Sequence, residues 1–257
     1  MFWSETNISG SISRKVRLQL DYQYRTQGIS DDLESQRVSN QVSDTRRGLF
    51  THAYQQVFRP WIAYQASKYF RVSLSPVGWW GTWRPTADNK TTFEPELRTT
   101  TQVLFSYPLG RVIFEQRFRY EFRFFGNRLL TDGSQGKDYY SNLWDNTTRK
   151  GRLRYMTRIF VPLNQPQMKE KTLYLAASDE IMIGMGSNVI HEKIFDQNRL
   201  YVGLGYKFTP QFRLEAGYVN QFQPQKRLAD GSKNSDINNV LQVFIVIDDI
   251  NKILKNL

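Results

Sequence analysis

Arginine dominates the residues of this chain that could do chemistry. Lysine and arginine together number 35 against 24 aspartates and glutamates, which gives a formal net charge of +11 at pH 7. Cysteine is absent, so disulfides and cysteine-based metal sites are excluded. Arginine side chains gathered on one face attract and select anions. The placement of the arginines along the backbone therefore decides which function we expect.

The clearest placement is in residues 111–125, where two chemically opposite sets of side chains alternate with a period of two. One set is apolar: Val112, Phe114, Phe118, Tyr120, Phe122 and Phe124. The other set is charged: Arg111, Glu115, Arg117, Arg119, Glu121 and Arg123. A helix would scatter these residues around its axis, whereas a strand sends them to opposite faces. This segment is predicted to be a long amphipathic strand.

The same alternation recurs along the chain, at 16–25, 152–161, 197–208 and 212–222, and more weakly at 47–66, 69–83, 94–107, 171–184 and 238–248. Together with 111–125 these segments make ten strands, and a short segment at 2–9 would be an eleventh. Single-chain bacterial barrels are even-numbered, so either 2–9 is not a full strand or one strand is missing from the count. The place for a missing strand is 47–66, where Gln55-Gln56 breaks the alternation as a bulge would. We predict ten to twelve strands.

Which face points inward separates a membrane barrel from a soluble one. The strands are long, and short turns alternate with long polar loops at 27–46, 84–94, 127–149 and 223–237. Tryptophan and tyrosine gather toward strand ends, as in interfacial girdles. One girdle would hold Trp3, Trp61, Tyr64 and Tyr107, and the other Trp79, Trp80, Trp83, Tyr139, Tyr140 and Trp144. We therefore predict an all-β, closed, antiparallel up-and-down transmembrane β-barrel with its apolar face toward lipid; a soluble barrel is the alternative.

The barrel is expected to occupy residues 1–249, followed by a short C-terminal tail at 250–257. In the tail, Ile250, Ile253, Leu254 and Leu257 have helical spacing behind Asp249, which could cap a short helix. A frayed tail is the alternative. Amphipathic strand begins almost at once after Phe2, so we expect a mature or re-started form whose export signal has been removed.

Several stretches resemble a known bacterial family. They are Phe2-Trp3-Ser4-Glu5, Asp21-Tyr22-Gln23-Tyr24-Arg25, Arg117-Phe118-Arg119-Tyr120-Glu121, Arg152-Leu153-Arg154-Tyr155, the lone Glu180, and Asn198-Arg199-Leu200 leading to Gly203-Leu204-Gly205-Tyr206. Together they make the chain similar to the family called domain of unknown function 2490. The resemblance implies an outer-membrane barrel of Gram-negative bacteria with no established activity. Many such barrels finish on an aromatic residue of the last strand, whereas this chain continues past Asp248.

The charged face is expected to line the lumen, with an excess of cations that accounts for most of the net charge. Paired charges would plug a narrow lumen, whereas unpaired ones attract water, counter-ions or an anionic ligand. Anion binding is predicted for Arg17, Arg98, Arg117, Arg119, Arg123, Arg154, Arg158, Arg199 and Arg213. Salt bridges within the lumen are predicted for Glu115, Glu121, Glu180 and Glu215.

The expected function is therefore a narrow, anion-preferring pore for small acidic solutes in the bacterial outer membrane. The alternative is a plugged structural or accessory barrel, a subunit of a larger outer-membrane assembly that contacts other outer-membrane proteins through Trp79, Trp80, Trp83 and Trp144. Either protein would have the lipid bilayer and lipopolysaccharide as partners, and neither needs a cofactor or a metal. Nucleic-acid binding is not expected, because a membrane barrel already explains the arginines that alternate with apolar residues.

An enzyme is not expected either. A lipid hydrolase would need a nucleophile near one of the 2 histidines, and Ser187-Asn188 with His191-Glu192 is the one candidate cluster. Such a short separation in a loop arises easily by accident. The phrases Asp132-Gly133-Ser134 and Asp230-Gly231-Ser232 invite a calcium interpretation, but Asp-Gly-Ser is more often a tight turn.

Overall fold

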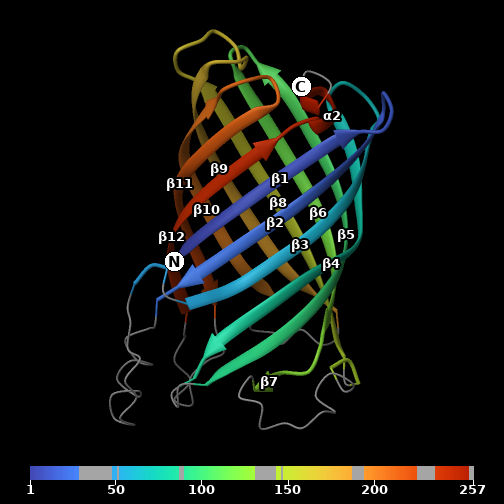
Figure 1. Cartoon of the computed structure of the whole chain (residues 1–257), viewed down its shortest axis with the longest axis vertical. Helices are drawn as coiled ribbons and strands as arrows, with labels where there is room; N and C mark the ends of the chain where they lie inside the picture. Colours follow the sequence, from blue (N-terminus) through green and yellow to red (C-terminus); the bar gives the residue numbers. More distant parts are fainter. Residues whose placement is uncertain are drawn as a thin grey trace.

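The chain folds into a closed β-barrel in the computed structural model (Figure 1), which describes residues 1–28, 48–50, 52–86, 90–130, 143–145, 147–186, 194–224 and 235–254. Within these residues, eleven strands form the barrel wall and a two-residue strand, β7 (Leu129–Leu130), pairs with the outer part of β5. The wall strands are β1 (Phe2–Ser11), β2 (Val16–Gln27), β3 (His52–Gln65), β4 (Phe70–Pro85), β5 (Thr91–Leu109), β6 (Val112–Phe125), β8 (Thr148–Pro162), β9 (Thr172–Met185), β10 (Phe195–Lys207), β11 (Phe212–Pro224) and β12 (Ser235–Ile247).

The two-residue alternation of the sequence becomes the two faces of the wall. On β6, Phe118 and Phe122 are 44% and 51% exposed on the outside, whereas Arg119 is 5% exposed and Glu121 is fully buried on the inside. Other strands follow the same rule, with Leu204 and Leu214 exposed outward and Glu180 and Glu215 buried inward. The prediction of an apolar outer face and a charged inner face is confirmed, because strand geometry separates alternate side chains regardless of the partner strand.

The barrel closes through a parallel pair of strands. Phe2 to Ile8 of β1 lie in register with Leu241 to Ile247 of β12, and the other neighbouring wall strands pair antiparallel. The eleven strands fall within the predicted ten to twelve, although the number is odd, and the expectation of wholly antiparallel pairing is wrong at this seam. An odd number of up-and-down strands leaves the first and last strands pointing the same way, so closure has to be parallel.

Both suspected errors in the strand count have a simple resolution. The segment at 2–9 is a full strand, since β1 pairs with β2 from Phe2 to Ser11. The segment at 47–66 holds a single strand, β3, whose register against β2 shifts between Gln55 and Ala53. Tyr54 is the extra residue of that bulge, so the broken alternation at Gln55-Gln56 marks a bulge and no additional strand.

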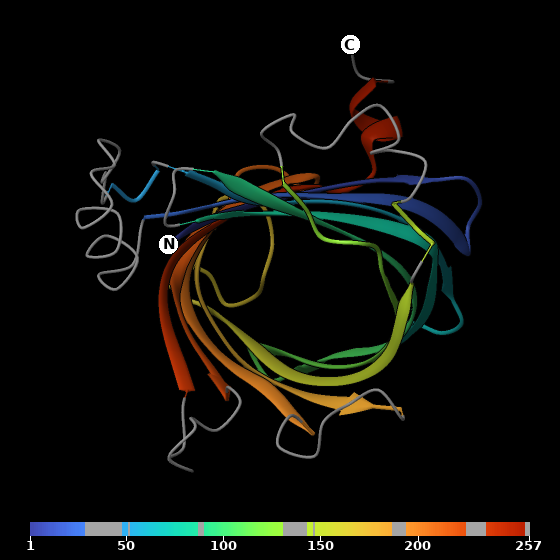
Figure 2. The ribbon, with the colours of Figure 1, turned by 90° about the horizontal axis from the view of Figure 1, so that it is seen from below.

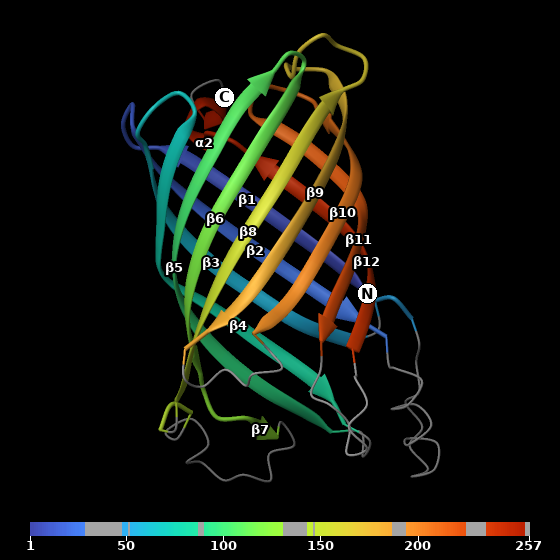
Figure 3. The ribbon, with the colours of Figure 1, turned by 180° about the vertical axis from the view of Figure 1, so that it is seen from behind.

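The barrel has two unlike ends. At the turn end, short connections at 12–15, 66–69, 110–111, 163–171 and 208–211 join the strands. At the loop end, the connections after β2, β4, β6, β9 and β11 contain the residues outside the described part of the chain. Met1 lies toward the loop end and the C-terminal segment at the turn end (Figures 1 and 3). The parallel seam thus places the start of β1 and the end of β12 at opposite ends.

A small apolar cluster fills one side of the lumen next to the seam. It contains Trp3, Phe160, Tyr174, Ala176, Tyr201, Val219 and Val240. The ring of Tyr174 packs directly over Gly205. A Cβ atom at position 205 would lie only 2.2 Å from Cζ of this ring. Glycine at this inward position therefore makes room for the ring. Charged side chains line the rest of the lumen.

After β12 the chain turns at Asp249, whose φ of 59° is positive, and forms the short helix α2 (Ile250–Leu254) on the outside of the wall (Figure 2). Asp249 does not cap this helix with its side chain as expected. Its carboxylate accepts a hydrogen bond from the Ser11 backbone N–H at 3.1 Å and lies 3.1 Å from the Lys252 ammonium. Asn251 donates to the Ser11 carbonyl at 2.8 Å. These contacts fasten the tail to the end of β1.

Polar side chains interrupt the apolar outer wall in at least two places. Asp179 is exposed at the middle of β9, and it points outward because its neighbours Ser178 and Glu180 face the lumen. Asn198 Nδ2 on β10 donates to Asp179 Oδ1 at 2.5 Å. Farther along the same wall, the Tyr218 hydroxyl donates to Asn239 Oδ1 at 2.5 Å. No helix in the described residues is long and apolar enough to span a membrane.

Candidate functional site

The candidate site is the lumen itself, which holds a cavity of about 1380 Å³. Its lining includes Arg71, Arg213 and Asp248 near the turn end, and Gln27 and Asp236 near the loop end. The cavity therefore extends along the barrel instead of forming a pocket at one end. The inward faces of the strands position its polar side chains, so the site is built from almost every wall strand.

Arginine is the chief cation of this lining. Among the described residues that line the cavity there are thirteen arginines and nine carboxylates. The excess of positive charge is thus real but smaller than the sequence predicted. Glu5, Glu94, Asp236 and Asp248 face the cavity and were missed. Glu5 was missed because β1 was not taken as a full strand; the other three lie at strand ends, where boundaries are hardest to place.

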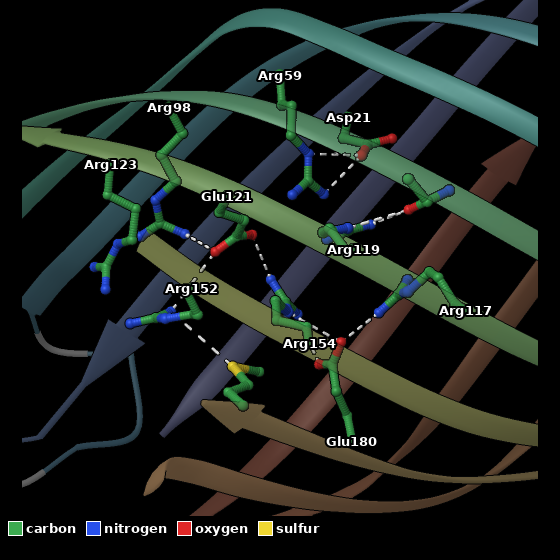
Figure 4. Close-up of polar contacts among 12 residues, drawn as sticks. Asp21, Arg59, Arg98, Arg117, Arg119, Glu121, Arg123, Arg152, Arg154 and Glu180 are labelled. Carbon is green, nitrogen blue, oxygen red and sulfur yellow. Dashed lines mark hydrogen bonds and ion pairs between the residues drawn. The ribbon is translucent and has the colours of Figure 1, made fainter. Parts of the chain in front are cut away.

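Eight of these arginines are ion-paired, and five of the eight pair with Glu96, Glu121 or Glu180; Figure 4 shows the contacts of Glu121 and Glu180. Glu121 accepts from Arg154 at 2.8 Å and from Arg98 at 3.4 Å, and Arg152 lies 3.9 Å away. Surrounded in this way, Glu121 has no exposed surface and does not line the cavity. A buried carboxylate is tolerated only with such partners.

The other two glutamates extend the same network across four strands. Arg154 of β8 binds Glu180 of β9 through two hydrogen bonds, at 3.0 and 2.6 Å. Arg117 of β6 reaches Glu180 at 2.6 Å. On β5, Glu96 accepts two hydrogen bonds from Arg98, at 2.6 and 2.8 Å, and further bonds from Arg123. Forked arginine–carboxylate pairs of this kind fix the position of both partners.

Three further pairs lie apart from this network: Arg84 pairs with Glu94 at 3.2 Å near the loop end, and the other two pairs are more deeply buried. Arg59 donates to Asp21 Oδ2 at 2.8 Å, and the indole N–H of Trp61 donates to the same oxygen at 2.7 Å. Arg158 pairs with Glu215, which also accepts from the Tyr174 hydroxyl at 3.0 Å. Both buried pairs lie within hydrogen-bonded surroundings, which offsets the cost of burying the charges.

Five lining arginines have no carboxylate within 4.0 Å in the part of the chain that the structure describes: Arg25, Arg71, Arg119, Arg199 and Arg213. Arg25 and Arg199 belong to the loop-end half, Arg119 to the middle of β6, and Arg71 and Arg213 to the turn end. They form a series of uncompensated cations along the cavity. Uncompensated cations in a confined space hold water or anions beside them.

Arg119 is the clearest member of this series. Its guanidinium donates twice to Gln102 Oε1, at 3.1 and 2.6 Å, and lies 5.2 Å from the ring centroid of Trp61. An amide oxygen and an indole face stabilise a cation without neutralising it. Arg119 therefore has no described carboxylate to balance its charge, although it is only 5% exposed.

The structure divides the predicted site residues into groups. Arg98, Arg117, Arg123, Arg154 and Arg158 are ion-paired, whereas Arg119, Arg199 and Arg213 face the cavity without a carboxylate partner among the described residues. Arg17 does not line the cavity; it donates to Ser9 Oγ at 2.7 Å and lies 4.0 Å from Asp248.

The predicted salt-bridge glutamates divide in the same manner. Glu121, Glu180 and Glu215 each contact arginine. Glu115 differs from them: it accepts from Ser106 Oγ at 3.1 Å, and no described arginine lies within 4.0 Å of it. Residue type and strand face were alike for all four, so the neighbours on adjoining strands make the difference.

Three tryptophans assigned to the girdles lie inside the barrel. Trp3, Trp61 and Trp80 are each at most 4% exposed, and each lies under an arginine. In the closest of these contacts, the guanidinium carbon of Arg98 lies 3.9 Å from the ring centroid of Trp80. Their assignment to a lipid girdle or to an outer contact surface is wrong. The signal was present for Trp3 and Trp61, which share strand parity with the inward residues Glu5 and Arg59.

The remaining candidates belong to residues that the structure does not describe. Tyr139, Tyr140, the cluster Ser187-Asn188 with His191-Glu192, Asp132-Gly133-Ser134 and Asp230-Gly231-Ser232 fall outside the described residues. Among the residues that the structure does describe, no group of three or more histidine, aspartate or glutamate side chains is arranged to hold a metal ion.

Comparison with known proteins identifies the family. Residues 1–230 match the model of the family described as "Protein of unknown function (DUF2490)", and the chain belongs to this family. No curated protein and no solved structure matches the chain. The matched region includes ten of the eleven wall strands within the described residues, and β12 and α2 follow it.

Proposed function

We propose that this DUF2490 barrel resides in a bacterial outer membrane and passes small acidic solutes through its lumen. The outer wall supports the membrane part of the proposal. Large apolar side chains such as Phe58, Ile62, Phe122, Leu200 and Leu204 are exposed on it. A soluble monomer rarely leaves so many large apolar groups in water, whereas a membrane barrel turns them toward lipid.

The observation that carries the transport part is the series of uncompensated arginines along the cavity. Arg25 and Arg199 lie toward the loop end, Arg119 in the middle, and Arg71 and Arg213 toward the turn end. An anion that moves along the cavity would meet one such arginine after another, while a cation would be repelled at each position. Because these arginines are distributed along the cavity, an anion bound at one position can move on to the next.

The paired arginines have a different part in this proposal. The network around Glu96, Glu121 and Glu180 occupies one side of the lumen and narrows the path. Fixed ion pairs attract a solute less strongly than unpaired arginines do, because the fields of paired charges partly cancel. They would hold the wall and the path in shape, and the unpaired arginines would select the solute.

The experiment is a reversal-potential measurement on the purified barrel in planar bilayers under a salt gradient. The wild type should prefer anions, and Arg119→Gln should move the reversal potential toward zero by removing the mid-lumen charge. Arg14→Gln is the matched control, since Arg14 is exposed in a turn outside the cavity. A barrel without conductance, or one that prefers cations, would contradict the proposal.

A second candidate function is a plugged structural or accessory barrel. The complete burial of Glu121 among Arg98, Arg152 and Arg154 favours it, because such a network occupies space within the lumen and could obstruct it. Trp79 and Trp83, whose rings lie 6.2 Å apart, would then belong to a contact surface on the outer wall. Crosslinking in native membranes should give a defined heteromeric product if this function holds, and only monomer if it does not.

A further inference from the structure

The indole ring of Trp3 on β1 contacts the guanidinium groups of two arginines that come from distant parts of the chain. The guanidinium carbon of Arg25 on β2 is 4.2 Å from its ring centroid, and that of Arg199 on β10 is 5.0 Å away. All three side chains line the cavity in its loop-end half. The closed barrel brings β10 and β2 to the same indole ring, across the parallel seam.

Neither arginine has a carboxylate within 4.0 Å among the described residues. Arg25 donates to the amide oxygens of Gln55 and Gln23, at 2.9 and 2.6 Å, and Arg199 makes one long bond to Gln197 at 3.4 Å. The nearest acidic side chain on β1, Glu5, is engaged by Asn7 and Gln23. Like charges held this close repel each other unless an anion accompanies them.

Several donors in this group also lack an acceptor. Trp3 is only 4% exposed, yet its indole Nε1 has no hydrogen-bond partner among the described residues. The Nε atoms of Arg25 and Arg199 are buried and without an acceptor in the same part of the chain. A buried donor without an acceptor is destabilising, and native structures seldom leave several together. Each of these N–H groups needs an acceptor oxygen, and an anionic acceptor would also balance the charge of the two arginines.

We propose that Trp3, Arg25 and Arg199 form a binding site for the oxyanion group of a small solute, a carboxylate or a phosphate, in the loop-end half of the lumen. Its oxygens would accept from the three side chains, and its charge would balance the two arginines. The role of this site in capturing a transported solute rests on the proposed function. As a binding site, it can be tested without any conductance.

The test follows the indole N–H resonance of Trp3 by NMR in barrel labelled with ¹⁵N-tryptophan and held in micelles. The chain has 6 tryptophans, and Trp3→Phe identifies the resonance by its loss. Succinate and inorganic phosphate are titrated separately, with chloride as the control anion. We expect one or both oxyanions to shift the Trp3 resonance downfield and saturably, and chloride to leave it in place. The oxyanion with the higher affinity identifies the solute class.

Arg25→Gln and Arg199→Gln should each weaken the binding about tenfold, while Arg14→Gln should leave it unchanged. The other indole resonances report whether each variant keeps the fold. Equal shifts with chloride, or no shift with either oxyanion, would overturn the site. An anion-selective conductance with no such shift would refute only the capture site, whereas saturable binding in a barrel that does not conduct would refute only the pore.

Discussion

Arg119 and Glu121 lie two residues apart on the same face of β6, yet their surroundings are opposite. Glu121 is enclosed by three arginines, whereas Arg119 has an amide and an indole ring but no described carboxylate within 4.0 Å. Removing one partner from a buried ion network leaves the others uncompensated, which costs far more than the net stabilisation of the intact network. The two residues should therefore respond differently to substitution: Glu121 through stability, and Arg119 through selectivity.

Glu121→Gln is expected to destabilise the folded barrel by roughly 3–5 kcal/mol, because Arg98, Arg152 and Arg154 would surround a neutral amide. Thermal unfolding in detergent, followed by the heat-dependent shift of the band on gels, measures the loss. Glu115→Gln is the matched control on the same strand face, and it should change little, since no described arginine lies within 4.0 Å of Glu115. Equal effects of the two variants would contradict the ion network.

Asp179 presents the opposite case on the outer wall. A carboxylate exposed to lipid near the middle of a strand is unfavourable, so Asp179→Leu should stabilise the barrel in lipid vesicles by about 1 kcal/mol. Urea unfolding from vesicles measures the change, and Asp179→Asn separates the effect of charge from that of size. A loss of stability with both variants would mean that this part of the wall does not face lipid.

At the scale of elements, the seam between β1 and β12 is the feature on which the barrel depends. It has seven paired positions, from Phe2 with Leu241 to Ile8 with Ile247, whereas β11 and β12 pair along the full length of both strands. Parallel pairing is also slightly weaker per residue than antiparallel pairing. The contacts of Asp249 and Asn251 with Ser11 fasten the end of β1 to the segment that follows β12.

The register of the seam can be tested with a disulfide, since the chain contains no cysteine of its own. Ser4 and Val243 are directly paired and belong to the outward-facing positions of β1 and β12. Ser4→Cys with Val243→Cys should therefore crosslink under mild oxidation and prevent separation of the strands, seen as a faster-migrating band. The control pair, Ser4→Cys with Val240→Cys, is out of register and faces opposite sides, so it should remain reduced. Crosslinking of the control pair alone would show a different seam.

At the scale of the whole molecule, the odd number of strands gives the barrel a direction. The start of β1 lies at the loop end and the end of β12 at the turn end. The two ends of the described chain are therefore at opposite ends of the barrel (Figures 1 and 3). In the proposed membrane setting, the unpaired arginines then run from one compartment to the other. The longer connections are expected outside the cell and the short turns in the periplasm.

This orientation predicts the sides from which single cysteines can be labelled. Asp145→Cys at the loop end should react with a membrane-impermeant maleimide on intact cells, whereas Ser13→Cys at the turn end should react only after the outer membrane is opened. Both positions are exposed in the structure, so access depends on the membrane and not on burial. Labelling of Ser13→Cys on intact cells, with Asp145→Cys protected, would show the reverse orientation.

The sequence by itself determined the strands and their two faces. The alternation of Phe118, Arg119, Tyr120 and Glu121 needs no tertiary information, because a strand separates neighbouring side chains wherever it lies. For the same reason the positions of most strands, the bulge near Gln55 and the charged lumen were predictable from local pattern. The family resemblance added support for this fold and nothing on activity.

Only the tertiary structure decided which charges neutralise each other and how the barrel closes. Arg119 and Arg154 look alike in the sequence, but of these two arginines only Arg154 pairs with Glu121 and Glu180. Pairing depends on which strands become neighbours and on their stagger. Trp3 lies under both Arg25 and Arg199 because the last strand meets the first in parallel. Contacts between residues so far apart along the chain have no local signal, and they determine where the lumen can attract an anion.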